Sequence, residues 1–124
     1  MEGIDTINES LLIIGGSGFI GSNITKAAVK RRFKITVLSL NIVDDINKIK
    51  GVEYAIADIS NLNQLNSCLP NFNFNYVINV SGYINHSGFF DGGRKILDSQ
   101  FLGLENILVA LNRSKLKRFI NIGS

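Results

Sequence analysis

The sequence predicts an α/β protein built on a doubly wound parallel sheet, and three observations lead to that prediction. Short apolar runs alternate with segments of helical spacing along most of the 124 residues. The first apolar run enters a glycine-rich turn, and the single proline, Pro70, indicates short loops. Such alternation implies right-handed βαβ units and a sheet that is buried on both faces. The expected strand order, numbered along the chain, is 3-2-1-4-5.

Each expected element follows from its own pattern. The expected strands are the apolar runs at residues 10–14, 34–38, 52–57, 76–80 and 118–122. The expected helices, with apolar residues three and four apart, are 18–32, 61–69 and 94–113. Asn61 fits the N-cap of the middle helix, and Pro70 stops that helix. Residues 41–50 form a polar loop or a short helix. One domain is therefore expected over residues 10–124, after a ragged lead-in at 1–9.

Composition and charge indicate an ordinary globular protein. The chain is 45% hydrophobic and 19% charged, with a formal net charge of +3. Two basic clusters consist of Lys26, Lys30, Arg31, Arg32 and Lys34, and of Lys115, Lys117 and Arg118. Solvated helix ends and turns explain them better than a nucleic-acid surface does, because no aromatic residues are interleaved with the charge. No nucleic-acid partner is expected.

Cysteine use and hydropathy indicate a location. The single cysteine, Cys68, excludes an internal disulfide and favours a reducing compartment. Its apolar helical surroundings favour a buried structural thiol over a nucleophile. No run approaches the roughly 20 apolar residues of a membrane span. Residues 1–9 are polar and lack the basic and apolar regions of a signal peptide. The cytoplasm is the expected location, and no membrane or metal site is expected.

The stretch that organises the chain is residues 11–21, where an apolar run enters a glycine-rich turn and then a helical segment. Gly15 would let the chain turn sharply off the strand. Gly18 would leave room for a pyrophosphate, and Gly21 would let the helix lie close on the sheet. The N–H groups at the start of the helix would then face the anion. A glycine-rich turn without any ligand is the alternative explanation.

The spacing Gly-x-x-Gly-x-x-Gly, with Phe-Ile between the last two glycines, resembles the short-chain dehydrogenase/reductase superfamily. Gly-Gly-Ser-Gly-Phe-Ile-Gly is similar to its extended branch, the NAD-dependent epimerase/dehydratase family. The resemblance implies a Rossmann-like fold and a bound NAD or NADP, with NAD slightly favoured. The cofactor-binding residues that it implies in this turn are Gly15, Ser17, Gly18, Phe19, Ile20 and Gly21.

Two further strand ends match the adenosine half of that site. In the family an Asp at the tip of the second strand binds the ribose, and here Ser39 and Asn41 stand in that region. Both can bond a ribose hydroxyl, but neither repels a 2′-phosphate, and Ser39 as a simple turn cap is an equal alternative. The resemblance also implies that Asp58 accepts a hydrogen bond from the adenine amino group and that Ile59 packs near the ring. For Asp58, a turn or helix cap is the alternative.

The fourth strand and the long helix carry weaker similarity. Asn79, Val80, Ser81 and Gly82 resemble the family's strand end, where small residues admit the cofactor. His86, the only histidine, is expected on the surface rather than in catalysis, because no partner is evident. Around residues 100–106 the sequence is similar to Asn-x-x-Gly-Thr-x-Asn, with Gln at 100 and Leu at 104 as departures. The glycine at 103 would permit close helix packing.

The last residues resemble the family's Lys-Arg-Phe-Val-x-x-Ser-Ser/Thr, which implies that Ser124 is the catalytic serine. The family's Tyr-x-x-x-Lys is absent, because none of the three tyrosines is followed by lysine at the fourth position. In the family this Tyr takes a proton from the substrate hydroxyl while hydride moves to the nicotinamide, and the Lys lowers its pKa. The domain is therefore expected to be incomplete, truncated after its fifth strand.

The resemblance implies an NAD(P)-dependent epimerase, dehydratase or reductase that acts on a nucleotide sugar. This chain would supply the cofactor-binding half and be inactive alone, and a homodimer would form through the 94–113 helix. The alternative is a non-catalytic dinucleotide sensor or scaffold domain of the same fold, favoured by the departures at Ser39 and Gln100. A weaker third hypothesis is RNA binding, suggested by the pI near 9.2.

Overall fold

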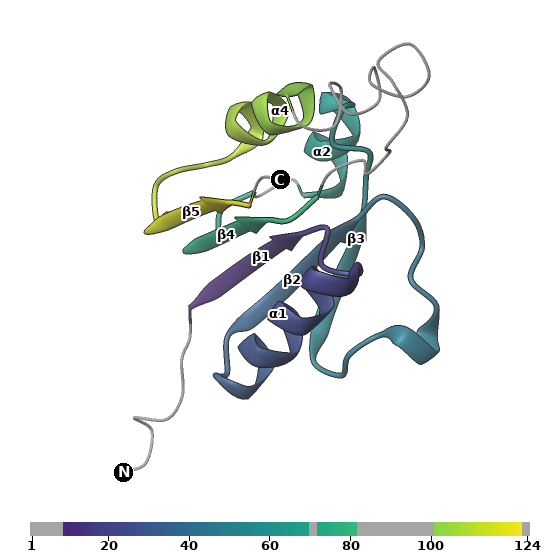
Figure 1. The fold of residues 1–124 in the computed structure, drawn as a ribbon. Helices are drawn as coiled ribbons and strands as arrows, with labels where there is room; N and C mark the ends of the chain where they lie inside the picture. Colours follow the sequence, from purple (N-terminus) through teal and green to yellow (C-terminus); the bar gives the residue numbers. More distant parts are fainter. Residues whose placement is uncertain (1–8, 70–71, 82–100, 123–124) are drawn as a thin grey trace.

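A computed structural model of the protein describes residues 9–69, 72–81 and 101–122. A five-stranded parallel sheet has the order β3-β2-β1-β4-β5, which confirms the predicted order (Figure 1). The strands are β1 (Ser10–Ile14), β2 (Lys34–Ser39), β3 (Val52–Ile56), β4 (Tyr76–Asn79) and β5 (Arg118–Asn121). The described helices are α1 (Phe19–Lys30), α2 (Leu62–Cys68), α4 (Gly103–Ala110) and the short 3-10 helix η2 (Asp45–Asn47).

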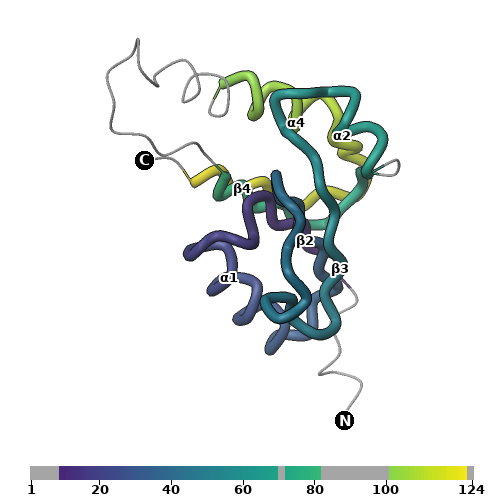
Figure 2. The backbone as a smooth tube through the Cα atoms, turned by 90° about the vertical axis from the view of Figure 1, so that its right-hand side faces the viewer, coloured from purple at the N-terminus to yellow at the C-terminus, as the bar shows by residue number. Residues whose placement is uncertain are grey.

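Helices cover both faces of this sheet, with α1 on one face and α2 and α4 on the other (Figure 2). Leu11 and Ile13 of β1 belong to the core under α1, whereas Leu12 and Ile14 belong to the core under α2 and α4. All four side chains are at most 4% exposed. Because neighbouring residues of a strand point to opposite faces, a central strand buried on both sides is apolar at nearly every position; in β1 the exception is Ser10, at its start.

Helix α1 is shorter at both ends than the predicted 18–32 segment. Gly18 is its N-cap in extended conformation. At the other end Arg32 takes a left-handed φ of 64°. The N–H groups of Arg32 and Phe33 donate to the carbonyls of Val29 and Ala28, at 3.0 and 3.3 Å. This is a Schellman-type end, so the residues after Lys30 close the helix instead of extending it.

The remaining helices follow the predictions in part. Asn61 is the N-cap of α2, because its side chain accepts a hydrogen bond from the Gln64 N–H at 3.1 Å. The polar 41–50 segment contains the 3-10 helix η2. The long helix expected over 94–113 is described from residue 101 and ends at Ala110 as α4, while residues 94–100 lie outside the described residues. In the described part of the chain, no helix is long and apolar enough to cross a membrane.

Cys68 lies at the end of α2 and is partly buried against the core under α2 and α4. Burial raises the pKa of its thiol above the ordinary value, although a backbone hydrogen bond opposes the shift. A higher pKa means less thiolate and lower nucleophilicity at neutral pH. The geometry therefore fits the structural thiol that the sequence predicts.

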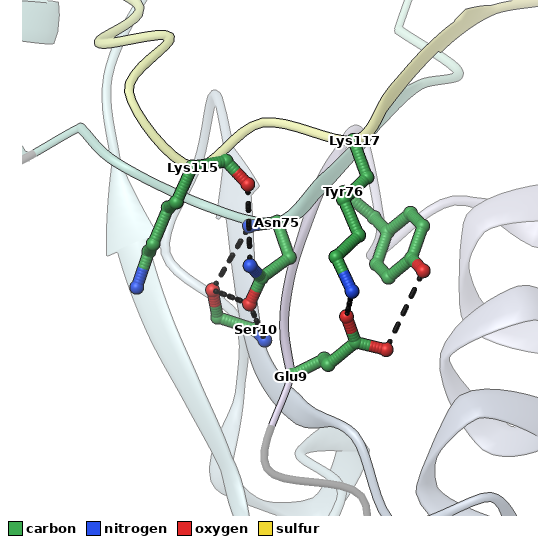
Figure 3. A network of polar contacts seen from close by, with 6 residues as sticks. All are labelled: Glu9, Ser10, Asn75, Tyr76, Lys115 and Lys117. Atoms are coloured by element: carbon green, nitrogen blue, oxygen red, sulfur yellow. Dashed lines mark hydrogen bonds and ion pairs between the residues drawn. The ribbon is translucent and has the colours of Figure 1, made fainter.

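Asn75 links β1 and β4 to the segment that enters β5, at the amino edge of the sheet (Figure 3). The Oδ1 atom of Asn75, directly before β4, accepts hydrogen bonds from the N–H and hydroxyl of Ser10 in β1, at 2.8 and 3.2 Å. Its Nδ2 donates to the Lys115 carbonyl at 3.2 Å. The Asn75 carbonyl also accepts from the Lys117 N–H at 2.7 Å. Asn75 thereby fixes the relative positions of β1, β4 and the segment entering β5.

Glu9 adds a charged contact beside Asn75 (Figure 3). Its carboxylate pairs with Lys117 and accepts a hydrogen bond from the Tyr76 hydroxyl at 3.4 Å. The hydrogen bond to this carboxylate holds the pKa of Lys117 above its usual value. The predicted lead-in covered residues 1–9, of which the structure describes Glu9 alone. Glu9 is therefore part of the packed sheet edge, which its polar sequence surroundings did not indicate.

Substitution Asn75→Ala is expected to lower the free energy of unfolding by about 2 kcal/mol, because three side-chain hydrogen bonds are lost and the buried Ser10 loses the acceptor of two of them. Chemical denaturation measures the change. Asn63→Ala on the exposed side of α2 is the control and should change the value by less than about 0.5 kcal/mol. Equal stability of the two variants would contradict the role given to Asn75.

Candidate functional site

The glycine-rich turn lies where the sheet changes direction of winding, between β2 on one side of β1 and β4 on the other. Gly15 has a φ of 84°, and its N–H donates to the Leu38 carbonyl of β2 at 2.7 Å. A Cβ atom added to Gly15 would lie 2.9 Å from the Cα and N atoms of Ser81. Only glycine fits both the left-handed conformation and this approach. The predicted sharp turn at Gly15 is confirmed.

The other glycines of the turn have different neighbours. A Cβ at Gly21 would lie 2.3 Å from the Gly15 carbonyl oxygen and 2.5 Å from Gly16 Cα. Gly21 therefore lets α1 pack against the turn, where the sequence predicted packing on the sheet. At Gly18 the nearest atom to such a Cβ is the Gly15 oxygen at an ordinary 3.6 Å. The side of the turn at Gly18 is thus open, as approach by a ligand would require.

Sequence reasoning missed Gly16. A Cβ at this position would lie 2.9 Å from both Cγ atoms of Val37, a fully buried residue of β2. Gly16 therefore lets the turn pack directly over β2. The sequence signal for this role was that two glycines stand together at positions 15 and 16. The prediction used only the glycines spaced three residues apart, so it assigned no role to the second glycine of the pair.

The mouth of the turn is exposed and carries no negative charge of its own. Ser17, Phe19 and Ile20 are exposed, with Phe19 at 85% and Ile20 at 54%. The first turn of α1 holds no acidic residue. The partial positive charge of the helix N-terminus is therefore not neutralised by a neighbouring carboxylate of that turn.

At the tip of β2, Ser39 caps a turn, which was the alternative to its predicted contact with a ribose. Ser39 is 4% exposed, and its hydroxyl donates to the Asn41 carbonyl at 2.9 Å. Asn41 itself is exposed. The Ser39 oxygen can still accept a hydrogen bond, so its predicted contact with a ribose stays a prediction.

Asp58 also organises a turn. Its Oδ1 atom accepts hydrogen bonds from the N–H and the hydroxyl of Ser60, at 2.9 and 2.7 Å. The Asp58 N–H donates to Gln64 Oε1 of α2 at 2.8 Å. Asp58 therefore stabilises a turn, as the alternative explanation expected, and its contact with adenine stays a prediction.

Ile59 points inward. It is 9% exposed and belongs to the core under α2 and α4. A Cβ at Gly103 would lie 2.5 Å from Ile59 Cδ1, which confirms that Gly103 permits close packing of α4. The Ile59 carbonyl accepts a hydrogen bond from Asn106 Nδ2 of α4 at 2.8 Å. The predicted contact of Ile59 with an adenine ring is untested, and the buried side chain would offer such a ring little surface.

Hydrogen bonds of the Asn79 side chain fix the end of β4. Asn79 is 4% exposed, its Nδ2 donates to Asn121 Oδ1 of β5 at 2.8 Å, and its Oδ1 accepts from the Ser81 N–H and hydroxyl. The Val80 N–H donates to the Ile14 carbonyl at 2.9 Å. Asn79 thereby fixes Ser81, the residue that Gly15 approaches. Sequence reasoning missed Asn121, whose only signal is its register opposite Asn79.

Several predicted residues lie outside the described residues: Gly82, His86, Gln100 and Ser124. The predicted catalytic role of Ser124 is therefore untested. Two residues before it, the N–H of Ile122 donates to the Asn79 carbonyl at 2.9 Å. The carboxyl ends of β1, β2, β3 and β4 bring together the described residues of the predicted cofactor site.

A parallel 3-2-1-4-5 sheet with a glycine-rich turn at its switch point defines a Rossmann-like domain. The chain belongs to the NAD dependent epimerase/dehydratase family, whose model it matches over residues 11–124. It is similar to a bifunctional UDP-glucose 4-epimerase and UDP-xylose 4-epimerase of Arabidopsis thaliana, with 20% identity over 93% of this chain and 36% of the relative.

Solved structures share the fold. An epimerase from Methanothermobacter thermautotrophicus has a TM-score of 0.77 at 22% identity, over 92% of this chain and 34% of that one. The UDP-glucose 4-epimerase of Thermus thermophilus in complex with NAD has a TM-score of 0.74 at 22% identity, over 89% and 36%. This chain thus spans about a third of the length of these relatives.

Substitution Gly15→Ala is expected to lower the free energy of unfolding by about 3 kcal/mol, combining left-handed strain with overlap against the Ser81 backbone. Gly51 is the matched control, because it has a similar φ of 86° but no atom within 4 Å of an added Cβ. Gly51→Ala should cost about 1 kcal/mol, from strain alone. Equal losses in urea denaturation would show that the contact with Ser81 carries no weight.

Proposed function

We propose that this chain binds NAD(P) across the carboxyl ends of β1 and β4, with the pyrophosphate over Gly18. The observation that carries the proposal is the Gly15 turn, which is packed against Ser81 on one side and is open at Gly18 on the other. The start of α1, free of acidic residues in its first turn, supplies N–H groups and partial positive charge for the anion. Ser17, Phe19 and Ile20 would border the bound cofactor.

The adenosine half would lie toward β2 and β3. Ser39 and Asn41 are proposed to meet the ribose, and Asp58 to accept a hydrogen bond from the adenine amino group. An uncharged β2 tip removes the usual repulsion of a 2′-phosphate, but no arginine follows within residues 39–41 to bind one. NAD is therefore proposed to bind somewhat more tightly than NADP.

The chain is proposed to form the cofactor-binding half of an NAD(P)-dependent epimerase, dehydratase or reductase of a nucleotide sugar, in the cytoplasm. Membership of the family and the similarity to a UDP-sugar epimerase support this substrate class. Ser124, with a hydroxyl able to bond the reacting oxygen of the substrate, is the proposed catalytic residue. The bound nicotinamide would supply hydride chemistry, while this chain binds and orients it.

A non-catalytic dinucleotide-binding domain is the second candidate. The hydroxyl of Ser39, where the family has a carboxylate, is already engaged with the Asn41 carbonyl. A Tyr-x-x-x-Lys segment elsewhere in the protein would favour the enzyme over the non-catalytic domain. That pair completes the proton transfer that Ser124 alone cannot perform.

Calorimetric titration of this chain with NAD is expected to give saturable binding, weaker for NADP, and no steady hydride transfer with UDP-sugars. Gly18→Val should weaken NAD binding at least about tenfold, because a branched side chain fills the space at the turn. Gly51→Ala should leave the affinity unchanged. Absence of NAD binding to the folded protein would overturn the proposal, and steady turnover would contradict its assignment as a cofactor-binding half.

We also propose that the chain forms a homodimer through the helix expected at 94–113. In its described part, Phe101, Leu102 and Val109 are 65%, 46% and 66% exposed. Apolar residues gathered on one helix favour burial against another apolar surface.

Sedimentation equilibrium is expected to show concentration-dependent self-association of the chain. Val109→Lys should shift the equilibrium toward the monomer, because a charge would be buried at the contact. Ile46→Lys is the control: Ile46 is 91% exposed but lies in η2, away from α4. A monomer at all concentrations, or an equal effect of both substitutions, would contradict the dimer.

A further inference from the structure

Two helices hold the short loop that carries Asp58. From α4, Asn106 Nδ2 donates to the Ile59 carbonyl at 2.8 Å. From α2, Gln64 Oε1 accepts from the Asp58 N–H at 2.8 Å. In the dipeptide Asp58-Ile59, Gln64 therefore binds the N–H at the amino end and Asn106 binds the carbonyl at the carboxyl end. Neither contact closes a helix or extends the sheet, so both act on the loop itself.

Further contacts fix the positions of these two amide side chains and of the Asp58 carboxylate. Asn106 is one turn after Gly103, whose missing Cβ lets Ile59 pack against α4. Gln64 is placed by Asn61, which caps α2 through the Gln64 N–H at 3.1 Å. Asp58 Oδ1 is then oriented by the N–H and hydroxyl of Ser60. Shifting either amide would move the Asp58 backbone and its carboxylate together.

We propose that Asn106 is a positioning residue for adenine recognition, acting with Gln64 to place the Asp58 carboxylate. This inference rests on the proposed binding of NAD(P). An amino group on the base donates to a carboxylate, whereas a carbonyl oxygen at the same position would repel it. Changing the positioning residues should therefore alter the ratio of the affinities for adenine and hypoxanthine nucleotides, and should not weaken both affinities equally.

The test compares ADP with IDP, which carries a carbonyl oxygen in place of the adenine amino group, by calorimetric titration of the full chain. Wild-type protein is expected to prefer ADP. Asn106→Asp keeps the size of the side chain, removes the donor and sets a carboxylate against the Ile59 carbonyl. It should weaken ADP binding about tenfold and leave IDP binding within about twofold, so the preference for ADP largely disappears.

Gln64→Ala is the second variant, since Gln64 is exposed and its loss should not unfold the protein if Asn106→Asp does. It should flatten the same preference. Asn63→Ala, the neighbouring exposed residue of α2, is the control and should bind both nucleotides like wild type.

Each outcome is decisive. If wild-type protein binds neither NAD nor ADP, the proposed function and this inference both fail. If wild-type protein prefers ADP and the folded variants keep that preference, the inference alone fails. Loss of ADP and IDP affinity by equal factors would indicate general loosening of the site and would also overturn the positioning role.

Discussion

The pairing of β1 with β4 is the constraint on which the rest of the structure depends. It places the residue that leaves β1, Gly15, against the backbone of Ser81 after β4. Because β2 lies on the other side of β1, the turn also meets the Leu38 carbonyl and the side chain of Val37. Three strands therefore define the shape of one short turn. This crowding alone requires glycine at positions 15, 16 and 21, whereas Gly18 is not crowded.

The sequence was sufficient for features that depend on local periodicity and turn chemistry. The five strands, the α2 cap at Asn61 and the sharp turn at Gly15 all follow from short-range patterns. The structure confirms them, with strand ends that agree with the predicted ranges to within one residue. The turn alternatives for Ser39 and Asp58 are of the same kind, because each side chain bonds a group two residues away. The alternation of strands and helices gave the strand order, and family resemblance added the site, whose ligand contacts remain predictions.

Features that depend on distant partners could not be predicted in this way. Asn106 meets Ile59 across 47 residues, and Asn79 meets Asn121 across 42. Asn75 meets Ser10 across 65 residues. An asparagine has no hydrophobic periodicity that would reveal its partner, so a polar residue in a loop and one linking two elements have the same sequence signal. Three asparagine side chains, Asn75, Asn79 and Asn106, thus make the long-range contacts that periodicity could not predict.

The two cores of the sheet differ in how far along the chain their members lie. The buried residues under α1, from Leu11 to Val37, all belong to the unit β1-α1-β2. The core under α2 and α4 instead combines Leu12 with Ile107 and Leu111, from far later in the chain. Contacts between residues near in sequence lose less chain entropy when they form. In folding, the first βαβ unit is therefore expected to become ordered early and to serve as the template on which the later strands assemble.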